Sequence, residues 1–258
     1  MGKLGAISAA RIAAPPQAPA AEEELRARFG HVTTWVFDLD NTLYPADSGI
    51  WPLIDERITL FLIDLFGLDG QSARALHQHY YLRHGTTLRG LVEEDIDEAE
   101  RFLEFVHDID RSILKPNPTL VREVARLAGR KLIFTNGSRN HAILTARQIG
   151  LDGLFEDAFD IVAAGLTPKP GRAAYDAFFE RYGVDPASAA MFEDVAKNLV
   201  VPKALGMTTV LVTPKPGQDD HRQPHDRVSA AVAAAAHLAD VVTDDLGLFL
   251  GRLNDALA

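Results

Sequence analysis

Short apolar runs alternate with longer amphipathic segments along most of the chain. The apolar runs are rich in β-branched and aromatic residues, which predicts buried strands at residues 33–37, 131–134, 189–192, 208–212 and 240–242, with a weaker candidate at 160–162. Helical spacing predicts helices from Pro118 to Gly129 and at about 141–148, 172–182, 195–205 and 228–238. Strands that alternate with helices indicate a doubly wound α/β fold with a mostly parallel sheet.

Residues 46–115 depart from this alternation because they contain no convincing strand pattern. Ile54, Ile58, Phe61, Leu62 and Leu65 fall at helical spacing, and further helices are expected at 72–82 and 88–106. We therefore expect a helical domain at 46–115, inserted into an α/β core formed by residues 31–45 and 116–258.

The N-terminal residues 1–30 are expected to form a flexible tail and a lead-in to the first strand. Residues 1–21 are rich in Ala and Pro, and Arg11 interrupts the one apolar run that could serve as a signal peptide; a weak export signal is the alternative. No apolar run approaches the roughly 20 residues that cross a bilayer, so no membrane is expected as a partner.

Composition narrows the chemistry. The chain has 258 residues, and 36 Asp and Glu against 26 Lys and Arg give a net charge of −10, which argues against a nucleic-acid polymer as partner. Cysteine is absent, so disulfides, thiolate metal sites and a Cys nucleophile are excluded, and we expect a cytoplasmic location. The sequence leaves the oligomeric state open.

Two carboxylates, Asp38 and Asp40, directly follow the first predicted strand, and Thr42 comes two residues later. In parallel sheets, ligands bind at the carboxyl ends of strands, so both carboxylates can point into one site. The alternative is an Asx-type turn that only leaves the strand.

The second strand and a later loop carry further polar candidates. Thr135, Asn136, Gly137 and Ser138 follow the second strand, where a hydroxyl and backbone N–H groups can hold phosphate oxygens or simply cap a helix. Lys169 lies between two prolines, which favours a fixed cation over a solvated lysine.

An acidic pair, Glu193 and Asp194, ends the strand predicted at 189–192, and Asn198 follows on the next helix. Buried acids are costly unless they are paired or bind a cation, although Asp194 could instead cap that helix. A second copy of the Thr-Pro-Lys-Pro-Gly motif surrounds Lys215 and leads into polar residues 218–227, which we expect to form an exposed loop.

In this order, these pieces resemble the haloacid dehalogenase superfamily, and specifically its phosphatases. Its four motifs match, in turn, Asp38-x-Asp40-x-Thr42, Thr135, Lys169 and Glu193-Asp194. Segments 37–45, 81–91 and 133–137 resemble the pyrimidine 5′-nucleotidase-like branch. The helical insert stands where this superfamily places a cap domain that closes over the substrate. Val195 departs from the small polar residue that relatives often carry there.

The resemblance implies a Mg²⁺-dependent phosphomonoesterase that acts on a nucleoside 5′-monophosphate through an aspartyl-phosphate. Mg²⁺ would be held by Asp38, the backbone carbonyl of Asp40, and Asp194. Asp38 would be the nucleophile and Asp40 the general acid and base, while Thr135 and Lys169 would bind the phosphoryl group. Dehalogenation is disfavoured because the dehalogenating branch carries no carboxylate at the position of Asp40.

Supporting roles fall to Thr42, Asn136 and Glu193, and to Asn198, which would orient Asp194 or a metal-bound water. The cap residues expected to meet the substrate are Arg83, His84, Thr86, Thr87 and Arg89; the alternative is a solvated cluster at a helix end.

Four other histidines, His77, His79, His221 and His225, are expected to be surface or satisfied residues rather than a zinc site. Other substrates remain possible: a sugar phosphate, phosphoglycolate or pyridoxal phosphate. A phosphomutase, or a non-catalytic binding protein on the same fold, is a further alternative.

Overall fold

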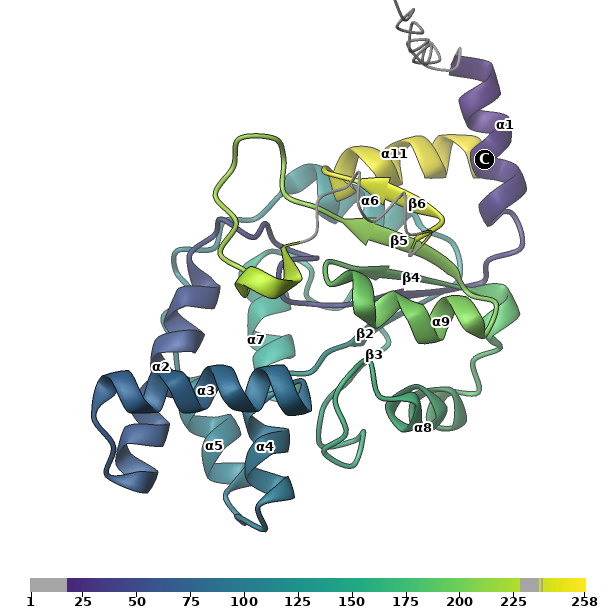
Figure 1. The fold of residues 1–258 in the computed structure, drawn as a ribbon. Coiled ribbons are helices and arrows are strands. Elements are labelled where there is room, and N and C mark those ends of the chain that lie inside the picture. The colour runs from purple at the N-terminus through teal and green to yellow at the C-terminus, as the bar shows by residue number, and fades with distance from the viewer. Residues whose placement is uncertain (1–17, 228–236, 238) are drawn as a thin grey trace, which may run out of the picture.

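The protein is described by a computed structural model that covers residues 18–227, 237 and 239–258. Its centre is a parallel sheet of six strands in the order β3-β2-β1-β4-β5-β6 (Figure 1). The strands are β1 (Thr34–Phe37), β2 (Arg130–Phe134), β3 (Asp157–Phe159), β4 (Ala189–Glu193), β5 (Thr208–Val212) and β6 (Val241–Thr243).

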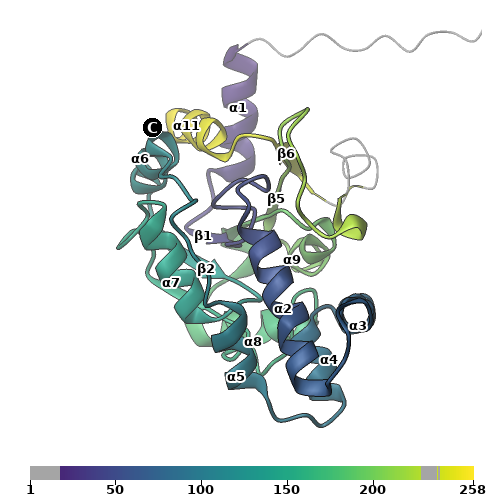
Figure 2. The same cartoon turned by 90° about the vertical axis from the view of Figure 1, so that its left-hand side faces the viewer.

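Helices cover both faces of this sheet (Figure 2). Trp35 and Phe37 of β1 face a core shared with α1 (Ala18–Phe29), α6 (Pro118–Arg126), α7 (Arg139–Gln148) and α11 (Leu246–Leu257). Val36 points to the opposite face, against α8 (Arg172–Tyr182), the short helix η2 (Ala196–Leu199) and α9 (Val200–Ala204). The predicted doubly wound α/β fold is confirmed.

The turn into β1's neighbour follows from local sequence. Asn117 caps α6, since its side chain accepts hydrogen bonds from the backbone N–H groups of Thr119 and Leu120, and Pro118 is the first helical residue. Gly129 then adopts φ 93°, and a Cβ there would lie 2.3 Å from the carbonyl oxygen of Thr33, so only glycine fits between α6 and β2.

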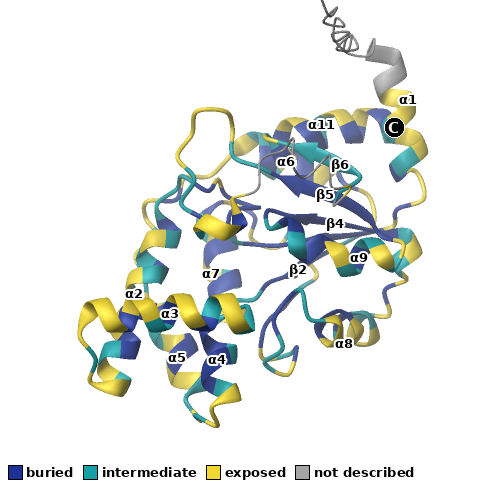
Figure 3. Cartoon of the chain, in the orientation of Figure 1, coloured by how far each residue is buried: buried dark blue, intermediate teal, exposed yellow. Residues whose placement is uncertain are grey.

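The insert between β1 and α6 consists of α2 (Ile50–Phe66), α3 (Gly70–His84), α4 (Thr87–Glu93) and α5 (Ala99–Val106). The helices form a separate group beside the sheet, with exposed outer faces and buried inner faces (Figures 1 and 3). The helix predicted at 88–106 is wrong as one element: Asp95 takes a left-handed φ of 57°, and the N–H of Ile96 bonds back to Leu91. This turn folds α5 back beside α4.

Three further differences have tertiary causes. Helix α1 was not predicted within the expected tail; Phe29 at its end is buried, with its ring centroid 6.3 Å from that of Trp35. The strand expected at 160–162 lies at Asp157–Phe159 instead, because Asp160 caps the next turn by accepting from the N–H groups of Ala163 and Arg139.

The helix expected at 195–205 is divided into η2 and α9. The helix expected at 228–238 lies outside the described residues at every position except 237. Two other short helices are η1 (Pro186–Ser188) and η3 (Pro224–Asp226). Within the described part of the chain, no helix combines the length and apolar character needed to cross a membrane.

Candidate active site

The carboxyl ends of three neighbouring strands form the site. Phe37 of β1 pairs with Ile133 of β2 on one side and with Phe192 of β4 on the other. The polar residues that follow these strands therefore meet at one sheet edge, where Lys169 joins them from the loop before α8. Parallel topology alone explains this convergence.

Lys169 is the fixed cation of the site. Its side chain is 1% exposed, and its Nζ donates to Asp38 Oδ1 at 2.6 Å, to Glu193 Oε2 at 2.7 Å and to the carbonyl oxygen of Phe134 at 2.8 Å. These bonds use all three ammonium donors. Burial opposes the charge, but Asp38 and Glu193 together raise the pKa of Lys169 above its ordinary value. The prediction of a fixed rather than solvated lysine is confirmed.

Negative charge exceeds positive charge in this cluster. One carboxylate oxygen from each of Asp38, Glu193 and Asp194 lies within 4.8 Å of the others. Burial, with a further contribution from Glu193, raises the pKa of Asp38 to about 8 against the opposing effect of Lys169. Burial and the same neighbour raise the pKa of Asp194. A bound cation would relieve both effects.

Orphaned polar atoms mark where such a cation fits. Asp194 Oδ2, Asn198 Oδ1, Thr42 Oγ1 and Asn41 Oδ1 are buried and have no hydrogen-bond partner among the described residues. Buried oxygens without partners are rare in native proteins. Oxygen atoms are the ligands that Mg²⁺ prefers, so this donor set fits a hydrated Mg²⁺.

Asn136 and Thr135 organise the second strand's end. Asn136 Oδ1 accepts from the backbone N–H of Lys169 at 2.8 Å, and its Nδ2 donates to the carbonyl oxygen of Lys169 at 3.2 Å. Thr135 Oγ1 accepts from the N–H of Gly137 at 2.9 Å. The hydroxyl proton of Thr135 therefore stays available for a phosphoryl oxygen.

Asp40 is held by two residues that sequence reasoning missed. Its Oδ1 accepts from the hydroxyl of Tyr44 at 2.5 Å and from Nε2 of His141 at 2.8 Å. Burial alone would raise the pKa of Asp40, but His141 and Tyr44 lower it to about 2. The signal for Tyr44 was its place four residues after Asp40; nothing local linked Asp40 to His141, 101 residues away.

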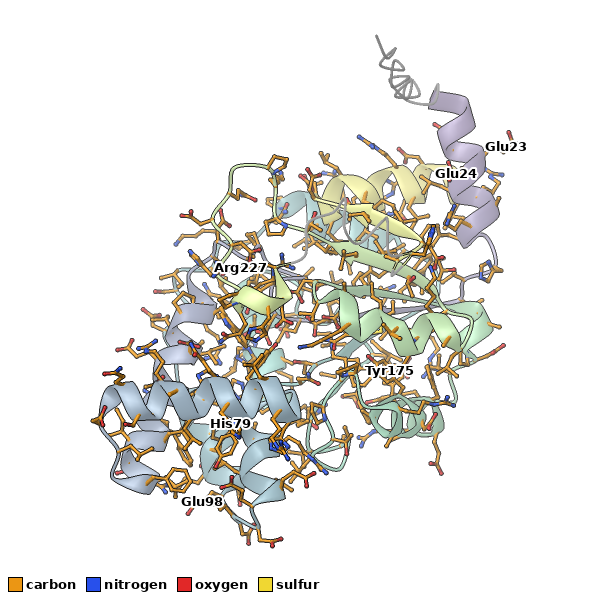
Figure 4. All side chains as sticks on the ribbon, viewed as in Figure 1. Glu23, Glu24, His79, Glu98, Tyr175 and Arg227 are labelled. Carbon is orange, nitrogen blue, oxygen red and sulfur yellow. The ribbon has the colours of Figure 1, made fainter. Side chains whose placement is uncertain are left out.

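The polar loop after β5 corrects a second expectation. Residues 218–227 were expected to be exposed, yet Arg222 and Asp226 are 4% exposed. Arg222 Nη1 donates to the carbonyl oxygen of Asp194 at 2.6 Å, and Lys197 pairs with Asp226 at 3.0 Å. Figure 4 labels Arg227 beside η3, where this loop returns toward the insert. The loop is buried because Asp194 and Lys197 anchor it, which its polar composition concealed.

Two adjoining cavities open at this edge. One, of about 90 Å³, is lined by the acidic cluster and by Trp51, Tyr81, Gly85 and Thr86 of the insert. The other, of about 100 Å³, shares Asp40, Trp51, Tyr81, Thr86 and Asn136 with it. Its remaining lining is mostly apolar and comes largely from α2, α4 and α5: Ile54, Ile58, His77, Thr87, Leu88, Phe102, Leu103, Val106, His107 and Gly137.

The insert residues expected to meet a substrate divide into two groups. Thr86 lines both cavities and caps α4, while Thr87 lines the apolar one. His84 and Arg89 line neither of these two cavities. Arg89 instead pairs with Glu93 and reaches the carbonyl oxygen of Leu166 at 3.5 Å, so it connects the insert to the core.

The four histidines expected to be surface or satisfied residues lie apart from the acidic cluster. His77 is 2% exposed, with Nδ1 3.5 Å from Asp55, and burial lowers its pKa. His79 is exposed on α3 (Figure 4), and the ring of the exposed His225 lies 5.2 Å from that of Tyr81. His221 is half-buried.

Known proteins carry the same fold and motifs. The family model of the haloacid dehalogenase-like hydrolases matches residues 32–206. "Phosphate metabolism protein 8" of Saccharomyces cerevisiae is 30% identical over 130 residues, which cover 46% of this chain and 40% of that protein. The chain thus matches less than half the length of that relative.

Solved structures agree on the fold. A HAD phosphatase from Thermococcus onnurineus matches with a TM-score of 0.56 and 18% identity, over 88% of this chain and 98% of its own. L-2-haloacid dehalogenase from Xanthobacter autotrophicus with chloropropionic acid covalently bound matches with a TM-score of 0.53 and 20% identity, over 88% and 100%. With the family match over more than half of its length, the chain belongs to the haloacid dehalogenase-like hydrolases.

Proposed function

We propose that the protein is a Mg²⁺-dependent phosphomonoesterase that acts on nucleoside 5′-monophosphates through an aspartyl-phosphate. The observation that carries this proposal is the buried contact of Asp38 with Lys169 in a cluster of excess negative charge, with Asp40 beside it. Such a cluster can accept a cation and a phosphate together, which an isolated buried ion pair cannot.

The chain's own residues divide the reaction between them. Asp38 attacks phosphorus as the substrate's ester oxygen leaves, which forms an acyl phosphate and splits one difficult step into two. Asp40 gives a proton to the departing oxygen and later takes one from the attacking water. Thr135 and backbone N–H groups hold the phosphoryl oxygens, and Lys169 offsets their charge.

Mg²⁺ would be held by Asp38, the backbone carbonyl of Asp40 and Asp194, and when bound it would neutralise charge on the phosphoryl group. The orphaned Oδ2 of Asp194 supports this assignment. Asn198 would orient Asp194 or a water, and Glu193 would keep Lys169 in place through its 2.7 Å contact.

Asp40 also supports phosphoryl transfer over dehalogenation. Both chemistries are represented among proteins with this fold. Displacement of halide needs no proton for the leaving group, whereas an alkoxide leaving group does. A carboxylate held at the site by two hydrogen bonds serves the second reaction.

The apolar cavity supports a small ring as the leaving group's outer part. In this proposal residues 46–115 form a cap over the site, and the cavity of about 100 Å³ accepts the base. A cavity of roughly 150 Å³ suffices for benzene, so this one suits a single ring better than a fused pair. A pyrimidine nucleotide therefore fits better than a purine nucleotide, and no nucleic-acid polymer is needed as partner.

The test is phosphate release from UMP, CMP, AMP, sugar phosphates, phosphoglycolate and pyridoxal phosphate, with and without Mg²⁺. We expect Mg²⁺-dependent release, with UMP and CMP hydrolysed with higher kcat/KM than AMP. Replacing Trp51 by Ala should reduce that preference by about tenfold, because the wall beside the ring is lost.

Leu82→Ala is the matched control, since Leu82 lies on α3 and is 66% exposed. Preference for pyridoxal phosphate or a sugar phosphate would reassign the substrate. Transfer of phosphate to a second sugar instead of water would identify a phosphomutase. No release from any compound with Mg²⁺ would overturn the proposal in favour of a binding protein.

A further inference from the structure

A chain of hydrogen bonds runs from the end of the insert to Asp40. Arg111, in the segment that leads from α5 back to the core, places Nη2 2.9 Å from Nδ1 of His141. His141 is fully buried on α7, and its Nε2 lies 2.8 Å from Asp40 Oδ1. Both contacts of the imidazole are thus made by charged partners.

The donor inventory fixes the tautomer of His141. A guanidinium has donors only, so Nδ1 of His141 must accept from Arg111 and cannot carry a proton. The proton of the neutral ring then lies on Nε2, from where it donates to Asp40. An imidazolium would set two donors against each other across 2.9 Å next to a second positive charge.

Arg111 is itself held in place. Its Nη2 also donates to the carbonyl oxygen of His107 at 2.8 Å, its Nη1 to that of Ile109 at 3.2 Å, and its Nε to Thr145 at 3.3 Å. The ring of His107 stacks on that of His141, with centroids 4.4 Å apart and planes at 18°. His141 therefore cannot turn its Nε2 away from Asp40 without breaking this packing.

Both donors to Asp40, from Tyr44 and His141, bond to Oδ1. No hydrogen bond to Oδ2 is present among residues 18–227 and 237–258 that the structure describes, and Asp40 lines the acidic cavity. Oδ2 is thus the oxygen free to exchange a proton with the leaving group or water.

We propose that His141, fixed as its Nε2–H tautomer by Arg111, is the positioning residue that aims Asp40 Oδ2 at the reacting oxygen. The inference rests on the proposed phosphatase function, since it deepens the role given to Asp40 there. It also assigns a role to the end of the insert, because Arg111 couples that segment to the acid and base of the core.

The first test compares two replacements of His141. His141→Leu removes the donor, and we expect kcat to fall about 10- to 100-fold with KM changed less than about threefold, as is typical when a supporting hydrogen bond is lost. His141→Gln keeps an N–H at the reach of Nε2 and should recover kcat to within about fivefold of wild type. His79→Gln, on the exposed surface of α3, is the matched control.

Arg111→Met tests the outer link without touching His141 or Asp40. It should lower kcat by about 3- to 30-fold, again with KM nearly unchanged. It also keeps the inference testable if His141→Leu does not fold. Equal losses in His141→Leu and His141→Gln, or a rise in KM alone, would overturn the positioning role.

Nitrogen-15 NMR of histidine-labelled protein tests the tautomer without any assay of activity. We expect the His141 signal, assigned by its loss in His141→Gln, to report a bare Nδ1 and a protonated Nε2, and to change in Arg111→Met. An imidazolium or an Nδ1–H tautomer would overturn the inference. Inactivity of wild type on all phosphates would instead refute the proposed function and leave this spectrum unaffected.

Discussion

Replacement of Asp194 by Asn should stabilise the metal-free protein while it abolishes the response to Mg²⁺. Asp194 is 4% exposed, and its carboxylate lies within 4.8 Å of those of Asp38 and Glu193. Two unit charges at that distance repel by about 3.5 kcal/mol at an effective dielectric constant of about 20. The protein reduces this cost by keeping a proton on the cluster, consistent with the raised pKa of Asp194.

Removal of the charge should therefore raise the free energy of unfolding by about 1–3 kcal/mol, a fraction of the repulsion between ionised groups. For a chain of this size, that gain corresponds to a rise in Tm of about 2–12 °C. In the wild type, Mg²⁺ at one hundred times its Kd should add about 2.7 kcal/mol, or roughly 5–10 °C.

Thermal unfolding with Mg²⁺ and with a chelator measures both effects. Asp176→Asn is the matched control, since Asp176 is an exposed carboxylate on α8 and should neither stabilise the protein nor change the Mg²⁺ response. A lower Tm for metal-free Asp194→Asn would refute the claim that like charges dominate this cluster. A full Mg²⁺ shift in that variant would refute the role of Asp194 as a ligand.

Four further outcomes follow from the site and the fold. Asp38→Asn should lower kcat by at least about 10³-fold, as measured by phosphate release with Mg²⁺; near-wild-type turnover would exclude Asp38 as nucleophile. Asp40→Asn should lose turnover yet still gain thermal stability from added phosphate, and loss of that gain would contradict its assignment to proton transfer alone. Gly90→Ala should lower stability by about 1–3 kcal/mol in denaturant unfolding, because its Cβ would lie 2.3 Å from the ring of Tyr80; an unchanged midpoint would show that the ring can move. Asn117→Ala should cost about 1 kcal/mol through loss of the α6 cap, seen as a Tm about 2–4 °C lower, and an unchanged Tm would show that the cap contributes little.

The sheet could be predicted because buried parallel strands carry a continuous apolar pattern. Thr34–Phe37 and Thr208–Val212 are buried at every position, and their composition alone indicated strands. Convergence of Asp38, Lys169 and Glu193 followed from topology, since each lies at or near the carboxyl end of a neighbouring strand. These are the parts of the molecule in which local sequence and tertiary structure agree.

The remainder depends on contacts between distant segments. Phe29 has a buried environment only because α1 docks on the core, and the weak amphipathic pattern of α1 gave no sign of it. Arg222 is buried because its guanidinium binds Asp220 and the carbonyl oxygen of Asp194. The hydrogen bond between His141 and Asp40 joins two strand ends 101 residues apart, and no periodicity reports such a pair.

The central claim, phosphoryl transfer to Asp38, is tested most directly by trapping the covalent intermediate. Wild-type protein is mixed with UMP and Mg²⁺, quenched in acid within the first turnover, reduced with borohydride to mark acyl phosphates, and digested for mass spectrometry. We predict a modification at residue 38 that requires both UMP and Mg²⁺ and is absent in Asp38→Asn. Active protein that is modified at Asp40 or Asp194, or at no carboxylate, would contradict the account.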